Sequence, residues 1–324
     1  MILKNLMKPI AAGLLGLGLA ASPAPANAIF TPEQAMVDLT YSIHQYAKAR
    51  NPSFQLLGNG AIGLLEVTKD ESAESVEKLL SSLDGFLGES IFYISKDGNI
   101  VPRDEQVLAY LDAMLAKPKN KGLAVWTLDY VTGDAAKDDR NKGEIRSYIS
   151  MTSPTTSLDE IPEMTGGNKK DVKTLKDAEN FLILNNPGAF GNKEDYLSAL
   201  SASPYDVLII DPYYGGSHLT AEDVKSLKKK PQGGKRLLLA YLSIGEAADY
   251  RPYWEDSWND ESSRPAWIEK ANPAWPGAYR VRYWTGAWKH ILYGNKDSSL
   301  DRILSAGFDG AMLDVMDAWM TFKS

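Results

Sequence analysis

The chain contains eight short, mainly apolar runs, separated by stretches of helical or turn-forming sequence. Continuously apolar strands are typical of parallel sheets, because helices cover both faces of such a sheet. Eight of them alternating with helices predict an α/β fold, a closed (β/α)8 TIM barrel, with a doubly wound open sheet as the second choice. The runs are residues 54–66, 89–94, 123–131, 181–186, 206–211, 236–246, 279–284 and 310–317.

Helices are expected between these runs. The clearest spans residues 31–50, where Thr31 is expected to cap the helix and Gln34 to complete a capping box. The stretch 150–178 is polar and rich in turn formers, so we expect a surface connection there. The other predicted helices are residues 74–83, 104–116, 192–201, 220–230 and 297–306.

The first 28 residues have the composition of a secretory signal peptide. Lys4 and Lys8 precede a stretch rich in Gly, Leu and Ala, which ends in the small-x-small cleavage pattern of residues 26–28. This stretch is shorter than the ~20 apolar residues that a membrane-spanning helix needs, so cleavage is favoured over an uncleaved anchor. The mature protein is expected to begin at Ile29, to be periplasmic or secreted, and to have no integral membrane segment.

Charge and composition exclude several classes of protein. The net charge is −7, whereas a nucleic-acid partner requires a basic patch. The chain has no Cys, which excludes disulfides and thiolate metal sites. None of its three histidines directly follows a strand run, which disfavours a Ser-His-Asp triad and a histidine-rich metal site. We therefore expect no cofactor, no metal and no nucleic acid, and the alternative that stays open is an all-oxygen Ca²⁺ site among the carboxylates.

Five of the apolar runs end on an acid or an amide: Asp129, Asn185, Asp211, Glu246 and Asp314. The carboxyl ends of all strands in a barrel face one mouth, so these side chains are expected to meet there. Acids crowded into a partly desolvated cleft cannot all keep their usual pKa, so one becomes a proton donor while another stays ionised. Glycoside hydrolysis requires such a pair. Each position taken alone also fits a helix cap or a turn.

Four segments resemble the strand motifs of a known family, the endo-α-1,4-polygalactosaminidase-like glycoside hydrolases. The resemblance is to the bacterial and archaeal branch once labelled cysteinyl-tRNA-synthetase-related. The segments are "YDVLIIDPYYGG" (205–216), "AYLSIGEAADYRPYW" (240–254), "NPAWPGAYRVRYW" (272–284) and "GFDGAMLDVMDAW" (307–319). The resemblance implies an exported glycoside hydrolase with a polysaccharide or oligosaccharide substrate, and amino-sugar polymers of the galactosaminide type are the first candidates.

In that family these motifs belong to barrel strands two to five. Segments 51–60, 83–93 and 123–131 resemble its strands six, seven and eight, which implies a circular permutation. The implied division of a single barrel of residues 29–324 is 31–131 for the last three strands, 132–180 for a connecting segment and 181–324 for the first five strands. The alternative is an unrelated N-terminal domain followed by a half barrel, which would leave two apolar sheet edges open.

The site residues follow from the strand ends together with the resemblance. The catalytic candidates are Glu246, Asp314, Asp249 and Asp211. Glu246 is expected to be the proton donor, because it ends the longest apolar run, with Asp314 or Asp249 as its ionised partner. Arg251 is expected to hold a carboxylate by two hydrogen bonds. The further candidates for substrate binding are Asn59, Asp84, Glu89, Asp129, Tyr130, Tyr213, Tyr250, Trp254, Trp284 and Asp317.

Two positions depart from the family pattern. Met312 stands where characterised relatives carry a Glu, and Thr285 stands where this branch usually carries an acid. A barrel without its catalytic pair would be a non-catalytic carbohydrate-binding protein of the cell envelope. A structural envelope protein is the third possibility, and it would have no pocket at the mouth. Two mouth carboxyls about 5 to 10 Å apart fit hydrolysis, whereas a larger spacing fits binding alone. We expect a monomer.

Overall fold

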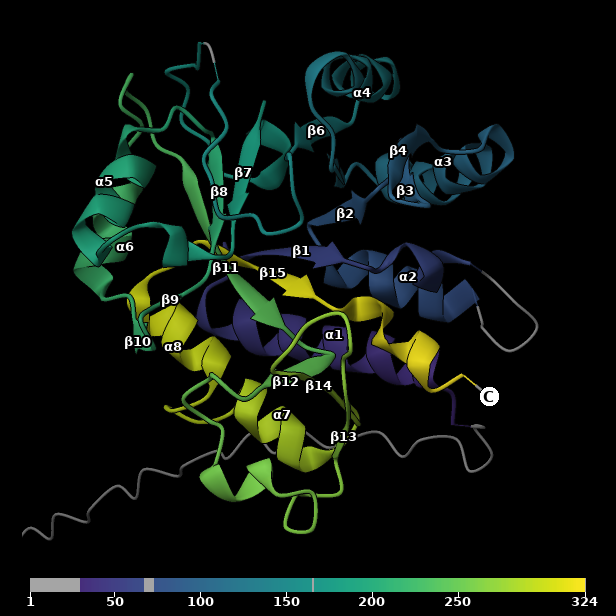
Figure 1. Ribbon diagram of the computed structural model, residues 1–324, viewed down its shortest axis with the longest axis vertical. Helices are drawn as coiled ribbons and strands as arrows, with labels where there is room; N and C mark the ends of the chain where they lie inside the picture. Colours follow the sequence, from purple (N-terminus) through teal and green to yellow (C-terminus); the bar gives the residue numbers. More distant parts are fainter. Residues whose placement is uncertain (1–29, 67–72, 165, 324) are drawn as a thin grey trace, which may run out of the picture. The chain divides into compact units, whose positions relative to one another are not determined.

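Eight parallel strands form one sheet that is nearly closed into a barrel (Figure 1). The order of the strands around it is β6-β5-β2-β1-β15-β11-β8-β7. This confirms the predicted α/β architecture and is consistent with a TIM barrel. The strands are β1 (Gln55–Asn59), β2 (Gly85–Glu89), β5 (Ala124–Asp129), β6 (Ile149–Thr152), β7 (Phe181–Leu184), β8 (Val207–Ile210), β11 (Leu237–Ser243) and β15 (Gly310–Asp314).

The computed structural model describes residues 30–66, 73–164 and 166–323. The predicted signal peptide, residues 1–28, lies outside the described residues. The barrel and its helices form one unit that starts at Thr31. Within the described ranges, no helix is both long enough and apolar enough to cross a membrane.

The first and last strands of the barrel are neighbours. β1 pairs with β15 from Gln55↔Gly310 to Gly58↔Leu313, and Figure 1 shows the purple β1 beside the yellow β15. Helix α1 (Pro32–Arg50) packs against the C-terminal 3-10 helix η5 (Met316–Thr321). The N-terminal and C-terminal parts of the chain therefore complete one sheet, which excludes a separate N-terminal domain followed by a half barrel.

One predicted barrel strand is wrong, and one barrel strand was not predicted. Residues 279–284 do not form a barrel strand, because β14 (Ala278–Val281) lies in a small antiparallel sheet with β12 (Glu246–Ala248) and β13 (Ile268–Ala271). The remaining barrel strand is β6, which overlaps the start of the stretch 150–178 that was expected to be a surface connection. β6 has the alternating sequence Ile-Ser-Met-Thr and is only partly buried, so it lacks the continuous apolarity on which the prediction relied.

The run predicted at 89–94 begins where its barrel strand ends. β2 spans Gly85–Glu89, and the apolar residues that follow lead into a hairpin of β3 (Tyr93–Lys96) and β4 (Asn99–Pro102). A second, two-residue hairpin is made by β9 (Tyr213–Tyr214) and β10 (Ser217–His218). Both hairpins follow the carboxyl end of a barrel strand.

The sheet is open between its two edge strands, β6 and β7. Among the described residues, no backbone ladder joins these two strands. The N–H of Ile183 instead donates to the sulfur of Met151 at 3.2 Å. The ring of Trp126 on β5 stacks on that of Phe181 on β7, with centroids 4.6 Å apart. Side-chain contacts therefore bridge the one gap in the sheet.

All six predicted helices are present, and two more were not predicted, α4 (Gly133–Arg146) and α7 (Gly286–Leu292). The Thr31 hydroxyl caps α1 by accepting from the N–H of Gln34 at 3.1 Å, as expected. The Gln34 side chain donates to Asp38. The other helices are α2 (Ala73–Ser82), α3 (Glu105–Asn120), α5 (Lys193–Ala202), α6 (Ala221–Leu227) and α8 (Ser299–Ala306), with short 3-10 helices η1 (Ile62–Leu65), η2 (Leu175–Asp177), η3 (Pro187–Ala189) and η4 (Asp256–Asn259).

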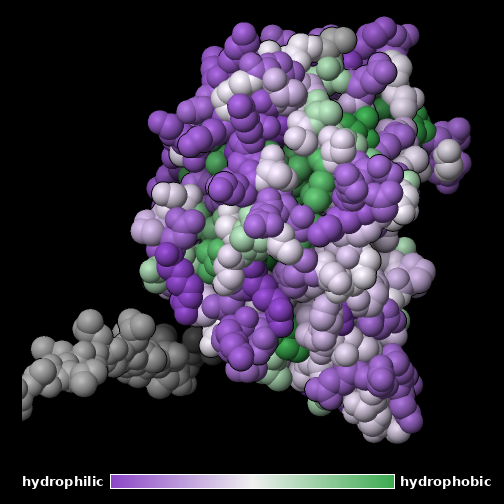
Figure 2. All heavy atoms as spheres, turned by 90° about the vertical axis from the view of Figure 1, so that its left-hand side faces the viewer, coloured by the Kyte–Doolittle hydropathy of each residue, from purple (hydrophilic) through white to green (hydrophobic). Residues whose placement is uncertain are grey.

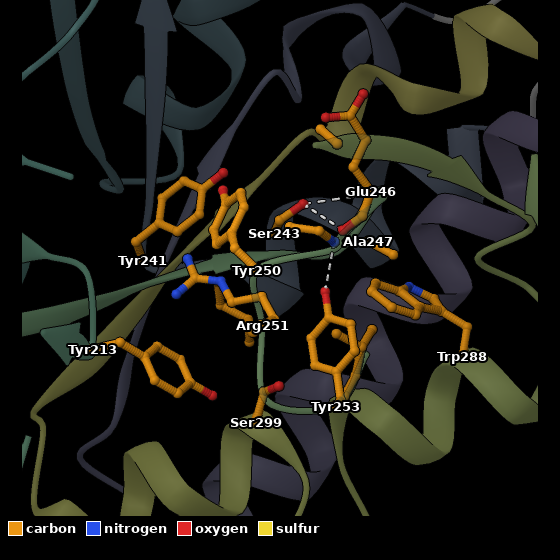
Figure 3. A pocket seen from close by; sticks show the side chains of 14 residues that line it. Tyr213, Tyr241, Ser243, Glu246, Ala247, Tyr250, Arg251, Tyr253, Trp288 and Ser299 are labelled. Carbon is orange, nitrogen blue, oxygen red and sulfur yellow. Dashed lines mark hydrogen bonds between the residues drawn. The ribbon is translucent and has the colours of Figure 1, made fainter. Parts of the chain in front are cut away.

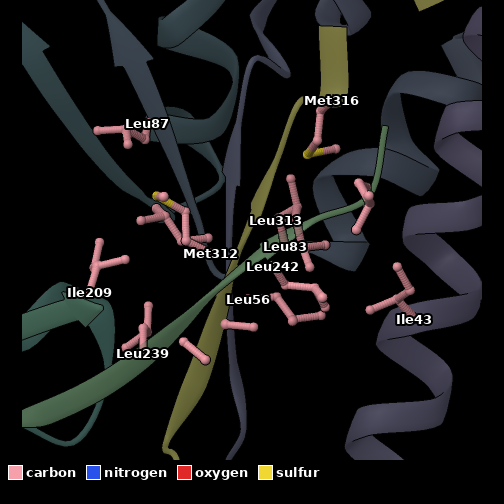
Figure 4. Packing of buried hydrophobic residues seen from close by; sticks show 14 of the residues in the cluster. Ile43, Leu56, Leu83, Leu87, Ile209, Leu239, Leu242, Met312, Leu313 and Met316 are labelled. Atoms are coloured by element: carbon pink, nitrogen blue, oxygen red, sulfur yellow. The ribbon is translucent and has the colours of Figure 1, made fainter. Parts of the chain in front are cut away.

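The core has two sides, because successive side chains of a strand point to opposite faces of the sheet. Figure 4 shows Leu239 and Met312 on one side of β11 and β15, and Leu242 and Leu313 on the other side, toward Ile43 of α1. All five side chains are buried. The face of the molecule in Figure 2 is mainly hydrophilic, with a few small hydrophobic patches.

Three aspartates precede barrel strands at the end of the barrel opposite the mouth: Asp84 before β2, Asp206 before β8 and Asp309 before β15. Asp84 accepts from the N–H of Leu56 at 2.8 Å and pairs with Lys48 at 3.1 Å. The structure thus does not bring Asp84 to the mouth, where it was expected to bind substrate. The physical reason is that it stands before its strand and not after it.

Candidate active site

A cavity of about 920 Å³ opens at the mouth of the barrel, where the barrel strands end. Both halves of the chain contribute to it. Ten of the predicted site residues line it: Asn59, Glu89, Tyr130, Asp211, Tyr213, Glu246, Tyr250, Arg251, Asp314 and Asp317. Asn185 and Met312 line it as well. Within the described residues, no group of three or more His, Asp or Glu side chains is arranged to hold a metal ion.

Asn59 lies between two carboxylates in the cavity. Because β1 lies between β15 and β2 in the sheet, its last residue is flanked by Asp314 and Glu89. Asn59 Nδ2 donates to Glu89 Oε1 at 2.5 Å and to Asp314 Oδ1 at 2.7 Å. The two oxygens are therefore at most 5.2 Å apart, the sum of these distances. Asn59 thus holds two of the mouth carboxyl groups close together.

Asp314 is the carboxyl group with the clearest acid character in the cavity. Burial raises the pKa of Asp314 to about 6, and the negative charge of Glu89 adds to the rise. Hydrogen bonds from Tyr241 and Asn59 act in the opposite direction. Asp314 points into the cavity because it follows Met312 by two residues, and residues two apart on a strand share a face. A carboxyl group with this pKa is suited to donate a proton in mildly acidic solution.

Glu246 lies on β12 directly opposite Arg280 of β14, in the register of the small antiparallel sheet. Glu246 Oε1 is 2.8 Å from Arg280 Nη1 and accepts from Asn272 Nδ2 at 2.8 Å. Burial raises the pKa of Glu246 above its usual value and the charge of Asp317 adds to the rise, whereas the charge of Arg280 and the bond from Asn272 offset part of it. Facing cross-strand pairs of opposite charge are favourable in antiparallel sheets, so this local fold stabilises Glu246 as a carboxylate.

Arg251 forms the expected bidentate pair, and its partner is Asp211. The two hydrogen bonds measure 2.8 and 2.9 Å. The guanidinium carbon lies 4.8 Å from the ring centre of Tyr213 and 5.2 Å from that of Tyr250. Figure 3 shows these side chains around a smaller cavity of about 50 Å³, with the carboxyl group of Glu246 pointing away from it. Asp211 therefore fixes Arg251, and Arg251 in turn supports two aromatic rings.

Asp129 is buried and points away from the cavity. Its carboxylate accepts from three consecutive N–H groups, those of Ile91, Phe92 and Tyr93, at 3.2, 3.0 and 2.8 Å. These residues form the turn that follows Glu89. Asp129 thus holds the backbone next to a cavity residue and is not itself among the residues that line the cavity.

Three other predicted residues lie outside the cavity lining. Asp249 is exposed. Trp254 stacks on Tyr279 with centroids 4.8 Å apart, and Trp284 packs edge-on against Phe322 at 5.0 Å. These two tryptophans belong to aromatic clusters around the small sheet and the C-terminus. Thr285 is the N-cap residue of α7.

Among the cavity residues that sequence reasoning missed are Tyr241, Asn272, Trp275 and Arg280. Tyr241 was detectable, because it lies two residues before Ser243, at the end of the same strand face. The other three belong to the segment 272–284, which was expected to be a barrel strand and its approach. These three residues instead lie in a loop and in the small antiparallel sheet at the mouth, which the strand prediction did not foresee.

Part of the chain is similar to known proteins. Residues 184–324 match the model of the glycoside-hydrolase family GH114. Three uncharacterized proteins are similar: one of Deinococcus radiodurans (37% identity over 130 residues, 40% of this chain and 39% of that protein), one of Thermotoga maritima (37% over 120 residues, 37% and 35%) and one of Methanocaldococcus jannaschii (32% over 174 residues, 52% and 47%). The chain thus spans less than half the length of each of these relatives.

Proposed function

We propose that the protein is a glycoside hydrolase in which Asp314 is the proton donor and Glu246 is the ionised partner. The observation that carries this proposal is that one cavity holds a partly buried carboxyl group, that of Asp314, whose pKa is raised to about 6, and a second one, that of Glu246, which is paired with Arg280. Two titratable groups held in different protonation states are the requirement of glycosidic bond cleavage. The family match over residues 184–324 supports the same class of reaction.

In the proposed reaction Asp314 protonates the glycosidic oxygen as the bond to the anomeric carbon breaks. The carboxylate of Glu246 stabilises the positive charge that develops on the sugar ring. One water is consumed: its hydroxyl goes to the anomeric carbon, and its remaining proton restores the acid form of Asp314. The roles are the reverse of those expected from the sequence, because Arg280 lies 2.8 Å from Glu246 and favours its ionised form.

The pH dependence of kcat/KM tests the acid assignment. Activity requires protonated Asp314, so kcat/KM is expected to fall as the pH rises through the pKa of about 6. Because the charge of Glu89 raises that pKa, Glu89→Gln should move the alkaline limb of the profile to lower pH. The full pH profiles of the two proteins measure this shift. An alkaline limb that stays in place in Glu89→Gln would remove Asp314 from the acid role.

The substrate class is tested with the purified mature protein. We propose a polysaccharide or oligosaccharide substrate, with amino-sugar polymers as first candidates because carboxylates crowd the cavity. Acetylated and deacetylated polymers of galactosamine and glucosamine, together with neutral glycans, are incubated with the protein, and new reducing ends are measured. We expect release from at least one polymer, and its loss in Glu246→Gln. No release from any of them would contradict the proposed function.

A carbohydrate-binding protein without catalysis is the second candidate. Met312, which lines the cavity at the position of the family's glutamate, is the observation that favours it. Calorimetry on the same polymers separates the two functions. Binding that is tight but never followed by new reducing ends supports the binding protein, whereas turnover supports the hydrolase.

We also propose that the barrel is a circular permutant of the GH114 arrangement. The family match begins at the last residue of β7, next to the junction without a backbone ladder, and Lys323 Nζ lies 3.0 Å from Glu33 Oε1. Joining residues 323 and 31 by a short linker and opening the exposed stretch 154–157 should therefore give a folded protein. Circular dichroism and Tm close to those of the parent are expected. An unfolded product would contradict the proposal, and a chain opened within β11 serves as the disrupted control.

Export and a monomeric state complete the proposal. Export is supported by the sequence of residues 1–28. N-terminal sequencing of the protein from the periplasm or medium should begin at Ile29, and light scattering should give the mass of one chain. An uncut chain retained in the cytoplasm, or a stable dimer, would contradict the respective statement.

A further inference from the structure

Two exposed aromatic side chains stand at the large cavity. Trp275 is 51% exposed and Tyr250 is 63% exposed, and both line the cavity. Of the large hydrophobic side chains that are exposed in the described part of the chain, these two alone line it. Trp and Tyr offer a flat apolar face together with a polar group, a combination suited to ligands that are partly apolar and partly hydroxylated.

The loop that carries Trp275 is stiff. Pro273 lies two residues before Trp275 and Pro276 follows it directly, and the proline ring fixes the backbone angle φ. The N–H of Trp275 donates to the carbonyl of Asn272 at 3.2 Å, and the N–H of Ala278 donates to the carbonyl of Trp275 at 3.0 Å. A side chain that is already held in place loses less conformational freedom when a ligand binds.

This loop contacts Asp249 and Tyr250 of the neighbouring loop. The N–H of Asp249 donates to the carbonyl of Gly277 at 2.9 Å. Gly277 has φ +87°, and a Cβ there would lie 2.8 Å from Asp249 Oδ1 and 3.4 Å from the Tyr250 ring. Glycine therefore allows the two loops to meet closely.

Asn272 connects the same loop to Glu246. Its Oδ1 accepts from the N–H of Ala274 at 3.0 Å, and its Nδ2 donates to Glu246 Oε1 at 2.8 Å. One amide thus bonds the loop of Trp275 on one side and the proposed catalytic carboxylate on the other. A ligand ring on Trp275 would lie beside the reacting sugar and within the same cavity.

We propose that Trp275 and Tyr250 form a subsite for a second sugar ring, next to the ring whose glycosidic bond is cleaved. This inference rests on the proposed function and deepens it, because it assigns the side chains that hold the sugar ring next to the cleaved bond. The cavity of about 920 Å³ lies near the upper end of the range for small-molecule sites, which leaves room for more than one ring.

The test compares Trp275→Ala with the parent on oligosaccharides of increasing length. We expect KM to rise about tenfold for substrates long enough to reach the subsite, with kcat nearly unchanged, and little change for the shortest substrate. Trp275→Phe keeps an aromatic face and should recover most of the loss. Tyr110→Ala removes an aromatic side chain that is 42% exposed and lies outside the cavity lining, so its kinetics should match those of the parent.

The outcomes separate the subsite from the proposed function. Equal KM values for Trp275→Ala and the parent at every length would overturn the subsite and leave the hydrolase standing. A fall in kcat of the same size at every length would also overturn it, because Trp275 would then act by positioning Glu246. A parent protein that neither binds nor cleaves any glycan would overturn both proposals.

Discussion

Replacing Asp314 by asparagine should lower kcat/KM for glycan hydrolysis by about 10²- to 10⁴-fold, the usual contribution of a general acid. The amide has the shape of the carboxyl group and still fits between Asn59 and Tyr241, but it has no acidic proton to give to the leaving oxygen. The loss should be much smaller for an aryl glycoside, whose leaving group departs without protonation. Initial rates at a pH near 6 on both kinds of substrate measure the difference.

Asp97→Asn is the matched control for that substitution. Asp97 is exposed in a hairpin turn, with φ +52°, a conformation that asparagine adopts readily. Its activity should equal that of the parent within error. An Asp314→Asn protein that keeps more than a tenth of the parental kcat/KM on the natural glycan would show that another group supplies the proton.

Replacing Lys230 by methionine should lower the free energy of unfolding by about 3 to 5 kcal/mol. Lys230 and Asp206 are both fully buried, with Nζ and Oδ1 2.6 Å apart. Asp206 also accepts from Asn168 and from the N–H of Glu179, so it ties the segment before β7 to the base of the barrel. Removing the ammonium leaves a buried carboxylate without its counter-ion. Thermal unfolding should show a fall in Tm of roughly 10 °C.

Two further variants make this stability prediction specific. Asp206→Asn added to Lys230→Met removes the unpaired charge and should recover part of the lost stability. Lys137→Met breaks an exposed pair with Asp134, whose side chain is 98% exposed, and should cost less than about 1 kcal/mol. Equal Tm values for Lys230→Met and Lys137→Met would contradict the importance of the buried pair.

Continuous apolarity located the barrel strands that are covered on both faces, such as β8 and β11, but it could not separate them from other buried runs. In the run 279–284, Tyr283 is buried and its hydroxyl donates to the carbonyl of Pro32. That packing lies outside the barrel sheet. β6 is a barrel strand with a half-polar sequence, since β5 alone pairs with it by a backbone ladder. Burial against other elements is a tertiary property that a local pattern does not contain.

The expectation that strand-end residues meet at the mouth was correct where the residue's side chain points to the inner face of the barrel. Asp314 and Asp211 line the cavity, but Asp129 does not, although it also ends its strand. Successive side chains point to opposite faces, so Asp129 and Tyr130 cannot both face the mouth, and it is Tyr130 that does. A sequence pattern that does not tell which face a side chain points to therefore locates a mouth residue only to within one position. Trp275 and Asn272 depended on a loop conformation that strand patterns do not describe.

The most direct test of the account is a crystal structure of the Asp314→Asn protein with a bound oligosaccharide substrate. We expect the sugar chain in the large cavity, with a glycosidic oxygen within about 3 Å of the side chain at position 314, Glu246 near the same ring, and the neighbouring ring on the face of Trp275. An oligosaccharide bound outside this cavity, or one whose glycosidic bonds all lie beyond hydrogen-bond reach of position 314, would contradict the account.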